Sequence, residues 1–161
     1  MSDIGIGVSV MVAVAFADSL WGALLATLLN TSTPDVVPVP TTGVEAFLVA
    51  VGACLLIPIG EELFFRGYTV TAWLRDLGTR SALIRSTIFF ALVHVANILV
   101  EPSPEGAFGG FKQSVLEVAV IAPVGFVLGW LFIRRGLLAS ISGHAAFNFI
   151  GILSLILTQA K

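Results

Sequence analysis

The chain has few charged residues for its length. Asp, Glu, Lys and Arg make up 11% of the 161 residues, and hydrophobic residues make up 57%. In soluble domains, by contrast, roughly a quarter of the residues are charged. The mean hydropathy is +1.02. This composition excludes an ordinary soluble protein and predicts a polytopic membrane protein, and the length sets an expectation of one domain.

Features typical of other protein classes are missing. Cys54 is the single cysteine, so no intrachain disulfide can form. With a net charge of −2 there is no basic patch to neutralise phosphates, which excludes a nucleic-acid partner. No positive region precedes the first apolar segment, which is too long for a signal peptide, so we expect a retained helix. The sequence also lacks a Gly-x-Ser-x-Gly elbow and a His-Glu-x-x-His pair, which disfavours a serine nucleophile and a one-helix zinc site.

Long apolar runs dominate what is present. About five segments are long enough to cross a membrane as helices, at roughly 4–29, 44–76, 81–100, 113–133 and 138–159. The polar, proline-rich stretch 30–43 and the stretch 101–110 predict loops. We therefore expect an all-α, polytopic transmembrane helical bundle of about five spanning helices. Its parts are an N-terminal helix and loop, 1–43, and a core, 44–161.

Single residues inside these runs refine the expectation. Pro58 removes one backbone hydrogen bond and crowds the carbonyl of Cys54, which predicts a kink. Gly125 and Gly129 have the small-xxx-small spacing that lets two helices approach closely. Asp18 lies in the middle of the first apolar run and has no partner nearby in sequence.

The basic residues predict the orientation. Five alternating spans place six of the eight on one side, namely Arg66, Arg75, Arg80, Arg85, Arg134 and Arg135. The other side holds Lys112 and Lys161. Because basic residues are enriched in cytoplasmic segments, we expect a multi-pass protein of the cell membrane with a cytoplasmic N-terminus.

Two adjacent carboxylates, Glu61 and Glu62, close an apolar run that carries no charge from 46 to 60. A charge at membrane depth costs roughly 2.5 to 3.5 kcal/mol on insertion scales, so such groups are functional candidates. On a helix Glu62 shares a face with Arg66, four residues later, and should pair with it. Glu61 points about 100° away from Glu62 and has no partner nearby in sequence, so it is the candidate for a catalytic role.

Four polar side chains on three helices are expected at similar depths. If Arg66, Arg85 and Arg135 mark the membrane interface on their three helices, Glu61 lies about 8 Å below it. The same count places His94 and His144 about 14 Å deep and Asn148 about 20 Å deep. Polar groups in one apolar slab should face one another or a water-filled cavity, here opening toward the cytoplasm.

This set supports hydrolysis by activated water. A carboxylate beside an imidazole can take a proton from water, and a second imidazole with an amide can stabilise an oxyanion. Two histidines and a carboxylate are also a sufficient ligand set for catalytic zinc, with Glu61, His94 and His144 as the alternative ligands. Residue types alone do not separate a cofactor-free mechanism from a zinc-dependent one.

The same residues carry a family resemblance. The motifs Glu61-Glu62-x-x-x-Arg66, Phe90-x-x-x-His94 and His144-x-x-x-Asn148 occur in order on three helices. They resemble the signature of the CPBP family, the membrane-embedded CAAX-processing and bacteriocin-processing proteases, also called the ABI family. The resemblance covers about residues 46–157 and marks 44–161 as a CPBP-like protease core.

The resemblance implies a role for each matching residue. Glu61 and His94 would activate the water, and His144 and Asn148 would stabilise the oxyanion. Three further side chains would support the site or pack beside it: Glu62, Arg66 and Phe90. The implied activity is that of a CAAX-processing-like intramembrane endopeptidase, glutamate-dependent or metal-dependent, that acts in membrane lipid on a peptide or protein substrate. Prenylated substrates belong to some family members and do not follow from this sequence, which also leaves the oligomeric state open.

Two other functions stay open. Glu61, His94 and His144 would also suit a proton or cation relay in a transporter core. The chain would equally serve as an inactive immunity or scaffold protein that keeps the fold. Ion flux without cleavage indicates the relay, and unchanged function of a Glu61→Gln variant indicates the scaffold.

Overall fold

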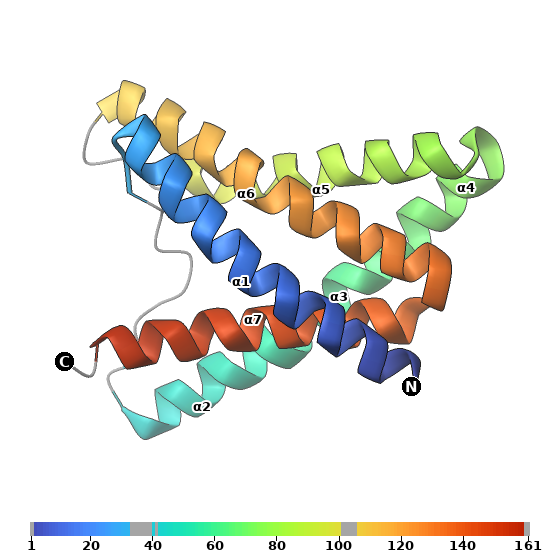
Figure 1. The fold of residues 1–161 in the computed structure, drawn as a ribbon, viewed down its shortest axis with the longest axis horizontal. Coiled ribbons are helices and arrows are strands. Elements are labelled where there is room, and N and C mark those ends of the chain that lie inside the picture. Colours follow the sequence, from blue (N-terminus) through green and yellow to red (C-terminus); the bar gives the residue numbers. More distant parts are fainter. Residues whose placement is uncertain (1, 33–39, 41, 101–105, 160–161) are drawn as a thin grey trace.

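The computed structural model describes residues 2–32, 40, 42–100 and 106–159, with the backbone alone at 97–100 and 158–159. All regular structure in these residues is helical, which confirms the all-α prediction. The chain forms five continuous helical rods (Figure 1). Four of them are α1 (Asp3–Leu29), α5 (Thr79–Val100), α6 (Gly106–Arg135) and α7 (Leu137–Gln159). The second rod contains α2 (Gly43–Val51), η1 (Gly52–Leu56), α3 (Ile57–Glu62), η2 (Leu63–Val70) and α4 (Thr71–Leu77).

Four of the five rods are long and apolar enough to cross a membrane. Four candidate spans occur within the described residues, at Asp3–Leu29, Gly43–Leu77, Gly106–Arg135 and Leu137–Leu157. The remaining expected span is α5, whose 22 residues reach about 33 Å at 1.5 Å per residue. This length matches the roughly 30 Å hydrocarbon core of a bilayer.

One predicted loop is partly wrong. Helix α6 begins at Gly106 and not near 113, so residues 106–110 are helical. Their glycines indicated a loop, but Gly109 is buried, and the exposed Phe108 and Phe111 suit a membrane environment. Of the other predicted loop, residues 33–39 and 41 lie outside the described part of the chain, as do 101–105 and Lys161.

The second rod contains two π-helical segments, η1 and η2. In η1 the N–H of Ile57 bonds to the carbonyl of Gly52, five residues back, and Pro58 follows at the start of α3. A π turn widens the helix by one residue, so the distortion expected at Pro58 takes this form. The Glu61-Glu62 pair follows within one turn.

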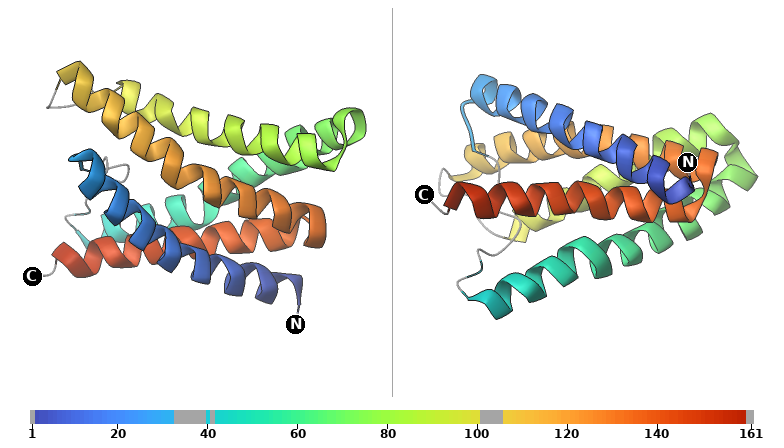
Figure 2. Two further views of the ribbon diagram at one scale, coloured as in Figure 1. Left: turned by 45° about the horizontal axis from the view of Figure 1, so that its top comes forward. Right: turned by 60° about the horizontal axis from the view of Figure 1, so that its bottom comes forward.

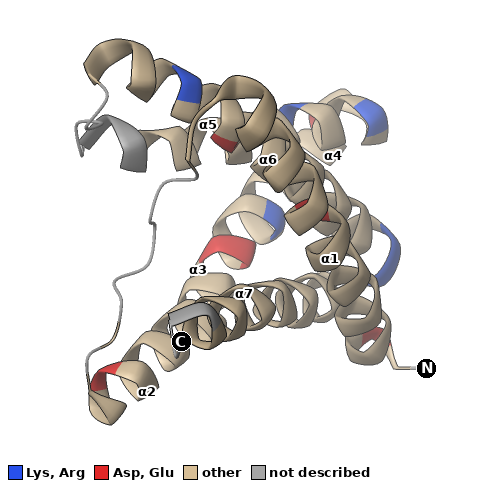
Figure 3. Ribbon diagram, turned by 60° about the vertical axis from the view of Figure 1, so that its left-hand side comes forward, with Lys and Arg blue, Asp and Glu red and all other residues tan. Residues whose placement is uncertain are grey.

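Successive rods run in opposite directions along the bundle (Figure 1). The N-terminus and the α4–α5 and α6–α7 turns lie at the same end of the bundle (Figure 1), and Arg135 Nη1 is 3.9 Å from Asp3 Oδ1 at this end. At the opposite end Lys112 Nζ donates to the carbonyl of Asn30. Figure 3 shows most of the basic residues near the first end.

Glycines bring the helices close together. A Cβ on Gly7 would lie 2.1 Å from the carbonyl oxygen of Ala139, so α1 packs tightly on α7. A Cβ on Gly125 or Gly129 would lie 2.8 Å from Phe90 or Leu83, which confirms the predicted close packing at these two glycines. In Figure 2 (right), α7 lies between α1 and the second rod.

Candidate functional site

Glu62 is completely buried and lies at the last residue of α3. Its Oε1 accepts from Arg66 Nη1 at 2.7 Å, which confirms the predicted ion pair between residues four apart. Oε1 also accepts from His144 Nδ1 at 2.9 Å, and Oε2 accepts from the hydroxyl of Ser140. Donors from its own rod and from α7 therefore hold both carboxylate oxygens.

Arg66 is buried inside the bundle, and the depth expected for Glu61 from its position stays a prediction. The Arg66 side chain is 1% exposed. Besides Glu62, it donates from Nη2 to the carbonyl of Gly125 at 3.0 Å, and its guanidinium lies 4.4 Å from the centre of the Phe90 ring. Pairing and hydrogen bonding allow a charge to stay inside the bundle instead of reaching water.

Glu61 differs from its neighbour in both exposure and partners. Its side chain is 28% exposed, yet its Oε2 atom is buried and has no hydrogen-bond partner among the described residues. The nearest charged or titratable partner atom is His144 Nε2 at 3.8 Å, which is too far for a direct hydrogen bond. A water molecule beside these two atoms could bond to both of them.

His144 lies between the two glutamates and is 4% exposed. An ionised carboxylate only accepts, so Nδ1 carries the proton that it donates to Glu62. Nε2 is then the ring nitrogen that faces Glu61. His144 can donate from Nε2 as well only when it is an imidazolium.

His94 approaches the same region from α5. Its Nδ1 lies 2.8 Å from the carbonyl of Phe90, and since a carbonyl only accepts, this nitrogen carries the proton. In the neutral ring Nε2 then has the lone pair. The Phe90 ring centre is 4.4 Å from that of His94 and 6.1 Å from that of His144, so this buried ring contacts His94 and also lies near His144.

Asn148 follows His144 by one turn of α7. Its Nδ2 donates to the carbonyl of Ala53, in η1, at 2.7 Å. This bond uses one of the two N–H groups of the amide. The structure thus brings Glu61, Glu62 and His144 into direct proximity, places His94 against Phe90, and joins Asn148 to η1 by a hydrogen bond.

The alternative ligand set does not fit a metal ion. No group of three His, Cys, Asp or Glu side chains in the described residues is close enough to hold one. Glu61, His94 and His144 are therefore not arranged as three ligands of one ion, and no metal-dependent step follows from their positions.

Two residues near the site, Ser140 and Glu117, were not among the candidates predicted from the sequence. Ser140 precedes His144 by four residues, a spacing that places both on one helix face and could have indicated a shared partner. Glu117 is 8% exposed in α6 and interacts electrostatically with His94 and Asp18. The sequence could have indicated Glu117 as it indicated Glu61, because an acidic residue inside an apolar run is a functional candidate.

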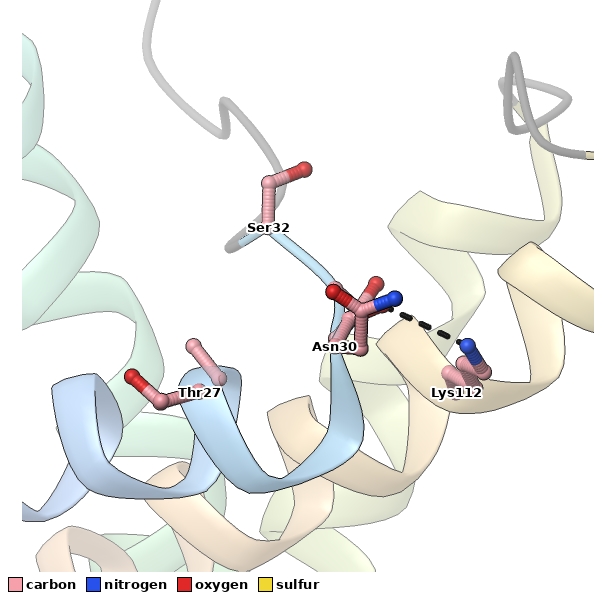
Figure 4. Close-up of a pocket in the computed structure, with 6 residues that line it drawn as sticks. Thr27, Asn30, Ser32 and Lys112 are labelled. Atoms are coloured by element: carbon pink, nitrogen blue, oxygen red, sulfur yellow. Dashed lines mark hydrogen bonds between the residues drawn. The ribbon is translucent and has the colours of Figure 1, made fainter.

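A polar pocket of about 480 Å³ lies elsewhere, where the end of α1 meets the first turns of α6 (Figure 4). Its lining includes Thr27, Asn30, Ser32 and Lys112, and none of the predicted site residues. It is separate from the candidate site.

The family model described as type II CAAX prenyl endopeptidase Rce1-like matches residues 43–150. This range contains all three motifs and begins at the first residue of α2. No curated protein and no solved structure matches the chain.

Proposed function

Because the chain belongs to the type II CAAX prenyl endopeptidase Rce1-like family, we propose that it cleaves a peptide bond with water activated at Glu61. Membership confirms the family resemblance that the three motifs indicated. The observation that supports the proposal best is the contrast between two adjacent carboxylates. Glu62 has both carboxylate oxygens bonded. Glu61, by contrast, has a buried oxygen that lies beside His144 Nε2 and has no hydrogen-bond partner in the part of the chain that the structure describes.

In the proposed reaction, Glu61 takes a proton from water as the water oxygen attacks the scissile carbonyl carbon. His94 Nε2, unprotonated while Nδ1 donates to Phe90, accepts the second hydrogen bond of that water and orients it. The carbonyl oxygen becomes the oxyanion. Collapse of the tetrahedral intermediate breaks the carbon–nitrogen bond, and the leaving amine takes the proton from Glu61.

The oxyanion would be stabilised from α7. His144 supplies Nε2–H in its imidazolium form, with Nδ1 held by Glu62. Asn148 supplies the N–H that is not bonded to Ala53. Removal of one such donor typically lowers kcat by roughly 10²–10³. This division assigns water activation to the side chains of α3 and α5, and charge stabilisation to α7.

The Glu61→Gln variant tests the proposal. Glutamine has nearly the same shape but cannot take a proton, so cleavage should fall by about 10² or more. The assay follows a fluorogenic peptide ending in a prenylated Cys-aliphatic-aliphatic-X sequence, with the purified protein in lipid nanodiscs. Asp76→Asn is the matched control, because Asp76 is an exposed carboxylate that bonds Arg75. Turnover by Glu61→Gln at the wild-type rate would refute the role of Glu61.

The same proteins separate the two alternative functions. A proton or cation relay predicts ion flux in liposomes that Glu61→Gln removes, and no cleavage product. An inactive immunity or scaffold protein predicts neither flux nor cleavage, and partner binding that Glu61→Gln leaves unchanged.

We also propose that the site faces the cytoplasm of a cell membrane. The support is the uneven distribution of basic residues: five arginines lie near the turns at Gly78 and Gly136, and Lys112 lies at the opposite end. In a Cys54→Ala background, a cysteine at Gly78 should react with an impermeant thiol reagent only after the cells are opened. A cysteine at Ser32 should react in intact cells, and the reverse pattern would overturn this orientation.

A further inference from the structure

Two prolines interrupt the described membrane helices, Pro58 at the start of α3 and Pro123 inside α6. Proline has no N–H, so each leaves one backbone carbonyl without a donor from its own helix. In a membrane such a carbonyl is costly unless a neighbouring helix supplies a donor. The structure identifies that donor for both prolines.

At Pro58 the register of η1 assigns the missing backbone donor to the carbonyl of Ala53. In η1 the N–H of Ile57 bonds to the carbonyl of Gly52. The next bond in this register would run from residue 58 to Ala53, but Pro58 has no hydrogen to donate. The Nδ2 of Asn148 occupies this position instead, 2.7 Å from Ala53 O.

Pro123 shows the same arrangement away from the proposed chemistry. In the ordinary α-helical register, residue 123 would donate to the carbonyl of Ala119. The indole Nε1 of Trp21, on α1, donates to this carbonyl at 3.1 Å. In both cases a side chain from another helix replaces the missing backbone N–H.

We propose that Pro58 is a positioning residue, which leaves Ala53 O unpaired and thereby orients the Asn148 amide for the oxyanion. The inference rests on the proposed function, in which Asn148 donates to that oxyanion. Because a carbonyl oxygen only accepts, Ala53 fixes which end of the amide faces η1. The second N–H is then available to the substrate. A flipped amide would present its own oxygen, which repels the oxyanion.

The variant Pro58→Ala tests this role. Alanine restores an N–H that can reach Ala53 O, so Asn148 loses its fixed acceptor. We expect kcat to fall about ten- to hundredfold, because a misplaced group loses most of its catalytic effect. KM should change less than twofold. The thermal midpoint should stay equal or rise, because alanine favours a helix where proline does not.

A double variant separates positioning from general damage. If Pro58 acts through Asn148, Pro58→Ala/Asn148→Ala should cleave no more slowly than Asn148→Ala alone. Pro123→Ala is the matched control, since it restores an N–H to Ala119 and releases Trp21 in the same way. Its kcat should stay within twofold of wild type.

A second readout does not depend on cleavage. In ¹⁵N-labelled protein in nanodiscs, the side-chain amide protons of Asn148 should exchange slowly in the wild type and faster in Pro58→Ala. Unchanged exchange in Pro58→Ala, or a multiplicative loss of kcat in the double variant, would overturn the inference. Wild-type cleavage by Asn148→Ala would instead refute the proposed oxyanion role, while the exchange rates still show whether Pro58 orients the amide.

Discussion

Replacing Glu62 with glutamine should destabilise the bundle, whereas the same replacement at Glu61 should not. Glu62 is 0% exposed and accepts from Arg66, Ser140 and His144. Glutamine keeps one acceptor oxygen and places an NH₂ group, which is a donor, where the other oxygen accepted. Arg66, 1% exposed, would keep its charge without a hydrogen-bonded carboxylate.

The size of the effect follows from the burial of the pair. Removing one partner of a buried ion pair costs roughly 3–5 kcal/mol, because the other charge stays buried and uncompensated. For a chain of this size, 1 kcal/mol corresponds to about 2–4 °C in Tm. We therefore expect the Tm of Glu62→Gln to fall by about 6–20 °C. Glu61→Gln should stay within about 2 °C, because its Oε2 loses no hydrogen bond.

Thermal unfolding of the purified variants in one detergent, followed by tryptophan fluorescence, measures both shifts. The double variant Glu62→Gln/Arg66→Met removes the stranded charge and should recover at least half of the lost Tm, since buried pairs can often be replaced by apolar groups. A Tm for Glu62→Gln within 2 °C of wild type would refute the structural role of this carboxylate. Equal and additive losses in the double variant would show that the two side chains act separately.

Two further predictions concern the Phe90 ring and the dependence on a metal ion. Gly125→Ala places a Cβ 2.8 Å from Cδ1 of the buried Phe90 ring and should cost about 1–3 kcal/mol, whereas Gly151→Ala, with no heavy atom within 4 Å, should leave Tm unchanged. Wild-type Tm and turnover in Gly125→Ala would show that Phe90 is free to move. Cleavage should also survive exhaustive chelation, because the candidate ligands do not gather around one point; stoichiometric metal on the purified protein, with activity lost on its removal, would contradict this.

The fold was predictable where it depends on the length of an apolar run. Each of the five expected segments corresponds to one rod, because an apolar run in a membrane must satisfy its backbone hydrogen bonds within a helix. The start of α6 was not predictable from composition, since Gly109 and Gly110 indicate a loop until the neighbouring helices are known. The hydrogen bond from Asn148 to the carbonyl of Ala53, 95 residues earlier, was not predictable either, because no local pattern contains a contact between two helices.

The sequence identified the candidate residues, but it did not predict all of the hydrogen bonds between them. Helical spacing correctly paired Glu62 with Arg66, since both lie on one continuous rod. It could not show that Ser140 and His144 also bond to Glu62, because these donors come from α7. Spacing along one helix identifies neighbours on that helix, whereas contacts between helices depend on rotation and depth that the sequence leaves undetermined.

The difference between Glu61 and Glu62 follows from this helical geometry. Consecutive residues point about 100° apart, so only one of two adjacent carboxylates can face both Arg66 and the α7 donors. Glu62 occupies that direction and holds His144 by Nδ1, which turns Nε2 toward Glu61. Loss of Glu62 should therefore reduce cleavage as well as stability, since it releases the ring that faces Glu61. Loss of Glu61 should affect cleavage alone, and the two variants together separate the group that reacts from the group that keeps the histidine in place.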